Sequence, residues 1–370
     1  MRISYLFNSS TPSSNPGSIQ VVNTCDGIAS HGHKIILITP NTGKNVSLKK
    51  FYGIKNNIKQ IKIKYFKKFP LRISYYLFSI FSVFYGIFFK TEIFITRNFF
   101  TLFLLNIFKK RTIIEIHHNL ENEGRIIQWI FKYIEIFNKK NIIKIVAITK
   151  AVKKFLIKSY NVRADKIEII PSGSSLRFNF KKLKKKNKYK IGYFGSLDIT
   201  KGSNFILKLS KFDKKNNYYI YGGNKDAVFK LRKINKSKNL KIYESINYGK
   251  IKKYISKMDI LLIPSNIKKI QSLGGIGNIV KYTSPLKLFD YLASGKLIIC
   301  TDTKVYHEIL THRKNCIMIK NLNIQNWKKT IFRLTKNLSL INTIKRNSYN
   351  LSKRYTYKIR AKTLLNFKIF

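Results

Sequence analysis

Apolar positions in the first half of the chain fall into short strand-like runs separated by helix-length segments. Residues 35–39 are a continuous apolar run, the pattern of a strand buried on both faces. A helix-length segment at 18–30 separates this run from another at 3–7. Strand, helix and strand with short joins predict a parallel α/β unit. The same rhythm predicts further strands at residues 92–96, 112–116 and 142–148.

A second α/β series follows a segment rich in turn residues and lysines. Its predicted strands are residues 189–194, 217–221, 240–243, 260–263 and 297–300. Past residue 325 the pattern is helical only. The fold class is therefore α/β, with two doubly wound Rossmann-like domains facing each other across a cleft. The predicted parts are an N-terminal domain (1–170), a linker (171–188), a C-terminal domain (189–335) and helices that pack back across both domains (336–370).

Residues 73–89 carry no charge and are rich in Phe and Tyr. A stretch of this length lies at the lower limit for spanning a bilayer. Three interpretations stay open: a core helix of the first domain, a helix partly inserted in the lipid interface, and a transmembrane helix.

The net charge of +57 would ordinarily indicate nucleic acid or an anionic membrane as a partner. Only 13 of the 73 basic residues are arginine, however, and the lysines are spread along a chain rich in Ile, Asn, Phe and Tyr. Proteins that recognise nucleic-acid bases or bind phosphates through two hydrogen bonds prefer the forked arginine side chain. Nucleic acid is thus not the expected partner, whereas attraction to acidic lipid headgroups remains an expectation. Three cysteines without CxxC spacing and an N-terminus without a continuous apolar segment favour a cytoplasmic location.

One candidate anion site lies in residues 282–300. Ser284 is a suitable N-cap and Pro285 a suitable first helical residue, so a helix is predicted to begin here. The amides of Leu286 and Lys287 would then lack intrahelical acceptors and, with the Lys287 side chain, could bind an anion. Asp290 on the same helix could accept hydrogen bonds from sugar hydroxyls. A capped structural helix with a solvated Asp is the alternative interpretation.

A second candidate lies at residues 193–202, where a strand ends in a glycine turn followed by a lysine. Gly195 would let the backbone approach a diphosphate, and Lys201 could neutralise it. Ligands of open α/β sheets bind at the carboxyl ends of the strands. Glycine turns of this kind are common, but two such segments in one α/β domain together favour a diphosphate site.

These two segments carry a resemblance to a known family. SPLKLFDYLASGK (284–296) and YFGSLDITKG (193–202) resemble the motifs of family 4 glycosyltransferases of the two-domain GT-B type. The resemblance implies a nucleotide-sugar donor, linked to UDP or GDP, in the second domain and an acceptor in the first. It also implies transfer with retention of configuration and no metal or other cofactor. Two departures stand out: Ser196 replaces a frequent arginine, and Tyr282 replaces the first glutamate of a pair whose second position is Asp290.

The predicted site combines catalytic and donor-binding residues. His117 follows a buried strand and could orient or deprotonate the acceptor hydroxyl, or contact the transferred sugar; a hydrogen-bonded structural histidine is the alternative. Lys201 would stabilise the leaving diphosphate. The predicted donor-binding residues are Gly17, Ser18, Gly195, Ser196, Glu244, Ser245, Ser284, Pro285, Leu286, Lys287 and Asp290.

The sequence thus predicts a retaining glycosyltransferase that acts on a glycan or lipid-linked acceptor in capsule or lipopolysaccharide synthesis. Its expected place is the cytoplasm, with peripheral contact to the inner face of the plasma membrane. A non-catalytic protein that binds anionic lipid or nucleic acid on a degenerate scaffold of the same fold is the alternative hypothesis.

Overall fold

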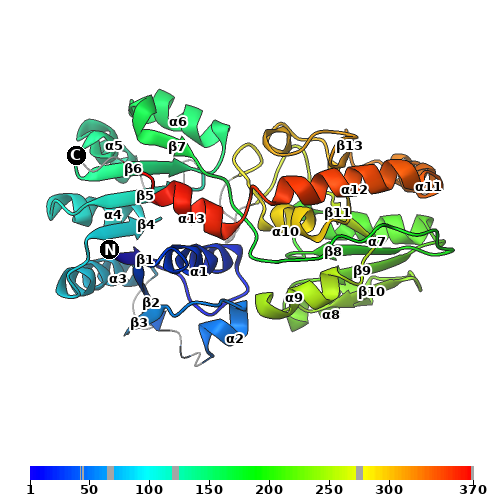
Figure 1. The fold of residues 1–370 in the computed structure, drawn as a ribbon, viewed down its shortest axis with the longest axis horizontal. Coiled ribbons are helices and arrows are strands. Elements are labelled where there is room, and N and C mark those ends of the chain that lie inside the picture. The colour runs from blue at the N-terminus through cyan, green and yellow to red at the C-terminus, as the bar shows by residue number, and fades with distance from the viewer. Residues whose placement is uncertain (42, 44–45, 65–70, 119–124, 272–277, 368–370) are drawn as a thin grey trace. The chain divides into compact units, whose positions relative to one another are not determined.

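Two parallel β-sheets organise the chain, one in each of the two units into which it divides (Figure 1). The computed structural model describes residues 1–41, 43, 46–64, 71–118, 125–271 and 278–367. Unit 1 contains Met1–Gly173 and Thr356–Phe370, and unit 2 contains Ser174–Tyr355. The last residues of the chain therefore return to the unit in which it began.

The sheet of unit 1 has seven strands in the order β3-β2-β1-β4-β5-β6-β7. All neighbouring strands pair in parallel. Apolar runs such as those of β2 and β5 are typical of parallel strands buried on both faces. The strands are β1 (Arg2–Leu6), β2 (Lys34–Asn41), β3 (Lys59–Lys64), β4 (Ile93–Thr96), β5 (Thr112–Ile116), β6 (Ile142–Ala147) and β7 (Ile167–Ile169).

Helices cover both faces of this sheet, and the returning chain end packs beside the first helix (Figure 1). Gly27 permits this close approach, because a Cβ atom there would lie 2.4 Å from the carbonyl oxygen of Tyr357. The helices are α1 (Pro16–Ala29), α2 (Leu48–Tyr52), α3 (Leu71–Phe88), α4 (Phe99–Ile107), α5 (Arg125–Tyr133), α6 (Lys150–Tyr160) and α13 (Tyr357–Leu365), with 3-10 turns η2 (Ile136–Asn138) and η3 (Ala164–Lys166).

The sheet of unit 2 has six parallel strands in the order β10-β9-β8-β11-β12-β13. The order reverses at β8, so the carboxyl ends of β8 and β11 form a topological switch point. The strands are β8 (Lys190–Phe194), β9 (Asn217–Tyr221), β10 (Leu240–Tyr243), β11 (Ile260–Ile263), β12 (Leu297–Thr301) and β13 (Ile317–Ile319).

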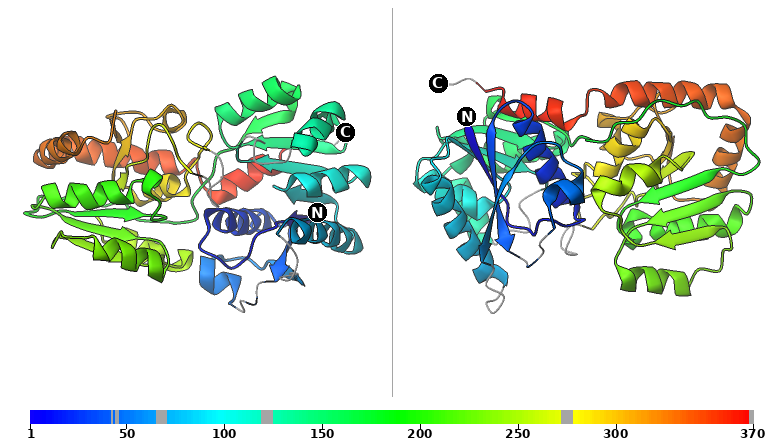
Figure 2. Two further views of the ribbon diagram at one scale, coloured as in Figure 1. Left: turned by 180° about the vertical axis from the view of Figure 1, so that it is seen from behind. Right: turned by 60° about the horizontal axis from the view of Figure 1, so that its bottom comes forward.

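Separate hydrophobic clusters cover the two faces of this sheet. Trp327 is buried in one cluster and Phe289 in the other. Within unit 2, α12 lies along α10, as both views in Figure 2 show. The helices are α7 (Ser203–Phe212), α8 (Lys225–Lys233), α9 (Tyr248–Ile255), α10 (Leu286–Ser294), α11 (Ile324–Lys336) and α12 (Leu338–Ser352), with 3-10 turns η4 (Ile199–Lys201) and η5 (Tyr306–Glu308).

The predicted α/β class and the two doubly wound sheets are confirmed, with local differences. The sequence analysis missed β3, β7 and β13. Residues 174–188 belong to unit 2 rather than to a free linker, because Leu183 is buried in its core and bonds Asn342 of α12. The terminal helices divide at Tyr355, so α12 lies in unit 2 and α13 in unit 1.

The uncharged segment 73–89 is mostly helix α3, which packs on β1, β2 and β3. Val83 is fully buried, whereas Phe88 is 77% exposed. Within the part of the chain that the structure describes, no helix has both the length and the hydropathy needed to cross a bilayer. The transmembrane interpretation therefore finds no support in α3, which has one buried and one exposed face.

Candidate functional site

The carboxyl edge of the unit 2 sheet opens between β8 and β11. These strands pair only through Ile191 and Gly192 of β8, so they separate before β8 ends. The hydroxyl of Tyr291, from α10, accepts a hydrogen bond from the backbone N–H of Phe194, the last residue of β8, at 2.8 Å. This contact ties α10 to the switch point and places the start of that helix at the end of β8.

Lys287, one turn before Tyr291, points toward the turn after β8. A Cβ atom on Gly195 would lie 2.7 Å from Lys287 Nζ, so the glycine leaves space for this ammonium group at the turn. The Nζ atom also lies 4.0 Å from the ring centroid of Tyr193. It is buried and has no hydrogen-bond partner within the described residues. A buried cation without a partner is a strong indication of a site for an anion.

Lys201 stands at the end of η4, which Asp198 caps by accepting from the Thr200 amide. Burial, and secondarily the charge of Lys201, lowers the pKa of Lys287 to about 7. No described carboxylate forms an ion pair with either lysine. The structure thus brings together Gly195, Lys201 and Lys287, three of the residues predicted from two separate motifs.

The start of α10 differs from the prediction by one residue. Pro285, with an extended backbone (φ −71°, ψ 128°), is the N-cap, and the helix begins at Leu286 rather than at Pro285. Because Pro285 itself is the N-cap, Ser284 lies one residue before the cap and not at it. The amides of Leu286 and Lys287 remain in the first turn, where they have no intrahelical acceptor. Ser196 lies in the turn after β8, and its carbonyl accepts a hydrogen bond from the Tyr193 hydroxyl.

Asp290 faces the protein interior rather than solvent. Its Oδ1 accepts hydrogen bonds from the hydroxyls of Ser174 (2.6 Å) and Tyr248 (2.8 Å). Burial raises its pKa to about 6, although these two hydrogen bonds act in the opposite direction. The structure therefore shows Asp290 linking three segments of unit 2, and its predicted contact with a sugar stays a prediction.

Glu244 and Ser245 are exposed at the end of β10, and the Ser245 amide bonds the Gly223 carbonyl. Beside them is a feature that the sequence analysis missed. The rings of Phe194, Tyr221 and Tyr243 stack across the ends of three neighbouring strands, with centroids 4.9 Å apart at each step. The outermost ring, Tyr243, is 37% exposed and offers a flat surface on which a planar group could stack.

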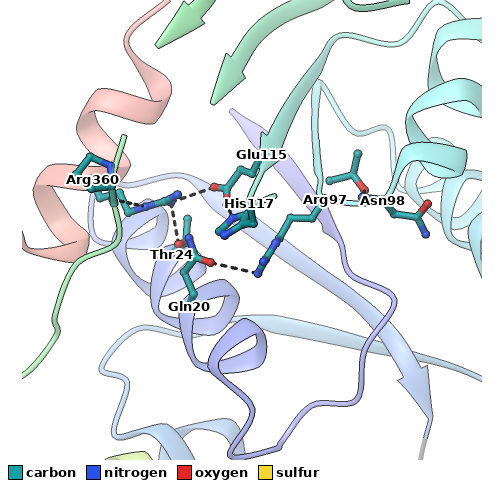
Figure 3. Close-up of polar contacts among 9 residues, drawn as sticks. Gln20, Thr24, Arg97, Asn98, Glu115, His117 and Arg360 are labelled. Carbon is teal, nitrogen blue, oxygen red and sulfur yellow. Dashed lines mark hydrogen bonds and ion pairs between the residues drawn. The ribbon is translucent and has the colours of Figure 1, made fainter. Parts of the chain in front are cut away.

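In unit 1, His117 lies directly after β5 and belongs to a buried polar cluster (Figure 3). Its Nε2 lies 3.3 Å from Glu115, whose other carboxylate oxygen accepts a bond from Arg360 of α13 at 3.0 Å. Arg360 also bonds Thr24 of α1 and the carbonyl of Pro171. The C-terminal helix therefore supplies the cation that holds Glu115, a contact that sequence reasoning did not find.

The charges around His117 determine which of its ring nitrogens is free. Burial alone would raise the pKa of Glu115, but Arg360 and the hydrogen bond from His117 lower it below its ordinary range. An ionised carboxylate only accepts, so Nε2 of His117 carries the hydrogen and Nδ1 has the lone pair. Burial, and then the charge of Arg97, lowers the pKa of His117 to about 3. His117 is therefore neutral near pH 7 and can accept a hydrogen bond through Nδ1.

Gly17 and Ser18 lie in the first turn of α1. The Ser18 hydroxyl is buried and donates to the Ser10 carbonyl, so this side chain is used within unit 1. The amides of this first turn lack intrahelical acceptors, as at any helix start. Their predicted contact with a donor stays a prediction.

Comparisons with known proteins agree with this arrangement. The model "Glycosyl transferases group 1" matches residues 175–351, and the model "Glycosyltransferase Family 4" matches residues 17–177. The two matches correspond closely to the two units. No curated protein sequence shows significant similarity to the chain.

Solved glycosyltransferase structures share the whole fold at low sequence identity. Sucrose-phosphate synthase from Thermosynechococcus elongatus has a TM-score of 0.73 at 12% identity, covering 98% of this chain and 97% of its own. Anabaena Alr3699/HepE in complex with UDP-glucose has a TM-score of 0.70 at 14% identity, covering 98% of both chains. WaaG, a glycosyltransferase involved in lipopolysaccharide biosynthesis, has a TM-score of 0.66 at 11% identity, covering 99% of this chain and 100% of its own. With both halves matched by models of one enzyme class and the GT-B fold shared throughout, the chain belongs to the family 4 glycosyltransferases.

Proposed function

We propose that this glycosyltransferase takes its sugar from a nucleotide-diphosphate donor bound by unit 2 and transfers it with retention of configuration. The observation that carries the proposal is the buried Nζ of Lys287, which lies beside the turn after β8 and has no hydrogen-bond partner among the described residues, with Lys201 at the end of η4 shortly after the same turn. They stand at the switch point of a parallel sheet, where nucleotides bind in this class of fold. UDP-glucose in the structure of Alr3699/HepE supports the same donor class.

The chemistry follows from where charge develops. When the bond between the anomeric carbon and the phosphate oxygen breaks, the diphosphate gains negative charge and the sugar becomes oxocarbenium-like. Lys201, Lys287 and the amides at the start of α10 are fixed positive groups, so they stabilise the transition state more than the ground state. The acceptor hydroxyl then attacks the face that the diphosphate leaves, and its proton passes to the departing phosphate oxygen. Because lysines supply the cations, transfer is proposed to need no metal.

The acceptor belongs to unit 1 in this proposal. His117 would accept a hydrogen bond through Nδ1 from a neighbouring hydroxyl of the acceptor and so position the attacking hydroxyl, whose own proton stays available to the departing phosphate oxygen. We propose a glycan or lipid-linked acceptor of a surface polysaccharide, such as capsule or lipopolysaccharide. The shared fold of WaaG, an enzyme of lipopolysaccharide biosynthesis, supports this class.

A thermal-shift panel tests the proposal. UDP, GDP and their sugar conjugates are added to the purified chain, and at least one nucleotide is expected to raise its Tm. A polyanion binder would instead respond to heparin or nucleic acid, with an affinity that falls steeply with salt. The absence of any nucleotide response across salt concentrations, together with a strong polyanion response, would contradict the proposal.

Donor binding is expected to take up a proton on Lys287. Its pKa is about 7 in the free protein, and a diphosphate beside Nζ raises it. At a pH between the pKa of Lys287 in the free protein and its higher pKa in the UDP complex, the complex holds more protons than the free protein. The affinity for UDP therefore falls as pH rises above about 7, by up to tenfold per pH unit. Calorimetry at about pH 8, in buffers of different ionisation enthalpy, measures the uptake. Lys287→Met should abolish both effects; an equal uptake in this variant would assign the proton elsewhere.

We further propose that unit 1 rests on an anionic membrane surface through α3 and α4. The two helices run side by side, and the rings of Phe84 and Phe108 meet at a centroid distance of 5.7 Å. Six apolar side chains near their carboxyl ends are each at least 40% exposed, and we call them the aromatic face: Phe81, Phe84, Tyr85, Phe88, Ile107 and Phe108.

Cations surround the aromatic face. Lys90 and Lys109 directly follow the two helices and are exposed, and Lys59 Nζ lies 4.3 Å from the ring centroid of Phe89. Exposed aromatic rings beside lysines match an interface in which rings enter the headgroup region and ammonium groups meet anionic lipids. This charge complementarity favours an anionic bilayer over an uncharged partner as the occupant.

The variant Phe84→Ser/Phe88→Ser tests the surface. Binding to vesicles of one third phosphatidylglycerol in phosphatidylcholine should fall at least roughly tenfold, because burying one Phe contributes about 1.5–3 kcal/mol. Sedimentation with the vesicles measures it. Phe229→Ser is the matched control, since Phe229 of unit 2 is 69% exposed. Unchanged vesicle binding, or loss of self-association in its place, would overturn the membrane assignment.

A further inference from the structure

The buried polar cluster of unit 1 has more positive than negative charge. Glu115 is its carboxylate, and Arg360 and His117 occupy the two oxygens of that group. Arg97, directly after β4, is the second guanidinium of the cluster (Figure 3). No ion pair among the described residues includes Arg97. Burial lowers the pKa of Arg97, as expected for a desolvated cation.

The Arg97 guanidinium lies against the start of α1. Its Nη1 donates to Gln20 Oε1 at 3.1 Å and lies 3.4 Å from the position that a Cβ atom on Gly17 would occupy. Its Cζ lies 5.9 Å from the ring centroid of Phe7. Gln20 is 2% exposed, and its Nε2 is a buried donor without a partner in the described structure.

Donors therefore gather at one place without an acceptor of matching charge. They are the guanidinium of Arg97, Nε2 of Gln20, and the first-turn amides of α1 at Gly17 and Ser18. Desolvated donors of this kind are costly unless an acceptor meets them, and an anion satisfies several at once. His117 follows β5, the strand next to β4, so the same sheet edge holds the residue assigned to the acceptor hydroxyl.

We propose that Arg97 and Gln20 bind an anionic group of the acceptor, a phosphate or a carboxylate located near the hydroxyl that receives the sugar. The proposal rests on the proposed function and narrows its acceptor to an acidic molecule, such as a lipid-linked phosphate or an acidic sugar. The forked guanidinium suits both groups through two parallel hydrogen bonds. The bound anion would supply the counter-charge that the protein itself does not give Arg97.

The test uses inorganic phosphate as the probe, on the full chain. Phosphate should raise the Tm of the wild type and of Lys201→Ala/Lys287→Met, in which the proposed donor site is removed. Adding Arg97→Gln to that double variant should weaken phosphate binding at least roughly tenfold, whereas Arg97→Gln alone should keep its affinity for UDP within about twofold. Equal phosphate binding by the double and the triple variant would overturn the proposal. So would loss of UDP affinity in Arg97→Gln alone, since Arg97 would then bind the donor phosphate.

Two further measurements separate this role from a structural one. Without ligand, Arg97→Gln should melt at or above the wild-type temperature, because it removes a partly buried cation that has no ion-pair partner among the described residues; a marked fall would indicate a structural arginine. If that variant does not fold, Gln20→Met keeps the arginine and should still weaken phosphate binding several-fold, whereas unchanged binding would contradict the site. Failure of UDP to bind the wild type would refute the proposed function while leaving phosphate binding at Arg97 measurable.

Discussion

Lys201→Ala is expected to lower the rate of sugar transfer by roughly 10²–10³-fold, the loss typical of one preorganised donor to a developing anion. The lysine follows a 3-10 turn that Asp198 caps, so its backbone is fixed before the donor arrives. Its charge acts mainly on the departing diphosphate. In this variant kcat should therefore fall together with kcat/KM. Both constants are measured with the nucleotide sugar at a saturating concentration.

Lys208→Ala is the matched control for this prediction. Lys208 is an exposed lysine on α7, the helix that follows Lys201. It should transfer sugar at the wild-type rate, which separates a local effect from the loss of one charge among many. A Lys201→Ala enzyme that turns over normally would remove Lys201 from the mechanism.

Arg360→Met is expected to destabilise unit 1 by about 3–5 kcal/mol, the usual result of removing one partner from a buried ion pair. The side chains of Arg360 and Glu115 are 2% and 0% exposed, so methionine would leave an uncompensated carboxylate in the interior. It would also release α13 from Thr24 and the Pro171 carbonyl. Urea unfolding followed by circular dichroism measures the change in free energy.

The control is Arg163→Met, which breaks an exposed pair with Asp165. Exposed pairs contribute little, so its unfolding midpoint should match that of the wild type. Equal midpoints for Arg163→Met and Arg360→Met would show that the buried pair does not hold the C-terminal helix. Glu115→Gln combined with Arg360→Met should recover part of the lost stability, because the carboxylate that lost its partner is then replaced by a neutral amide.

The sequence predicted the strands in which apolar residues predominate. β5, β9, β10 and β11 are observed at the predicted residues. The three missed strands have weaker patterns: β3 (KQIKIK) alternates lysine and isoleucine, and β7 and β13 are three residues long. All three are edge strands of their sheets. At an edge, a strand with one apolar face or only a few residues can still pair with its neighbour.

The candidate site was predictable where its residues lie in a local motif. A glycine after a strand and a lysine before a helix gave Gly195 and Lys201 from the sequence. Arg360 gave no such signal, since its contact with Glu115 joins residues 245 positions apart. Arg97 follows a predicted strand, as His117 does, so the same rule could have identified it. Its hydrogen bond with Gln20 of α1 could not be predicted, because the two residues meet only when β1, β4 and β5 have paired in the sheet.

The structure also gives a physical account of one departure from the family pattern. Ser196 stands where the resemblance leads one to expect an arginine, and Lys287 Nζ lies beside the same turn. Lys287 can therefore supply the second positive charge that Ser196 does not. Tyr282, at the position of the first family glutamate, is half-buried, and nothing in the structure explains its replacement.

The most direct test of the central claim is a crystal structure of the chain with UDP bound. The account predicts the diphosphate at the end of β8, with phosphate oxygens within about 3.2 Å of Lys201 Nζ, Lys287 Nζ and an amide in the first turn of α10. Well-ordered UDP whose diphosphate contacts neither lysine would contradict the account.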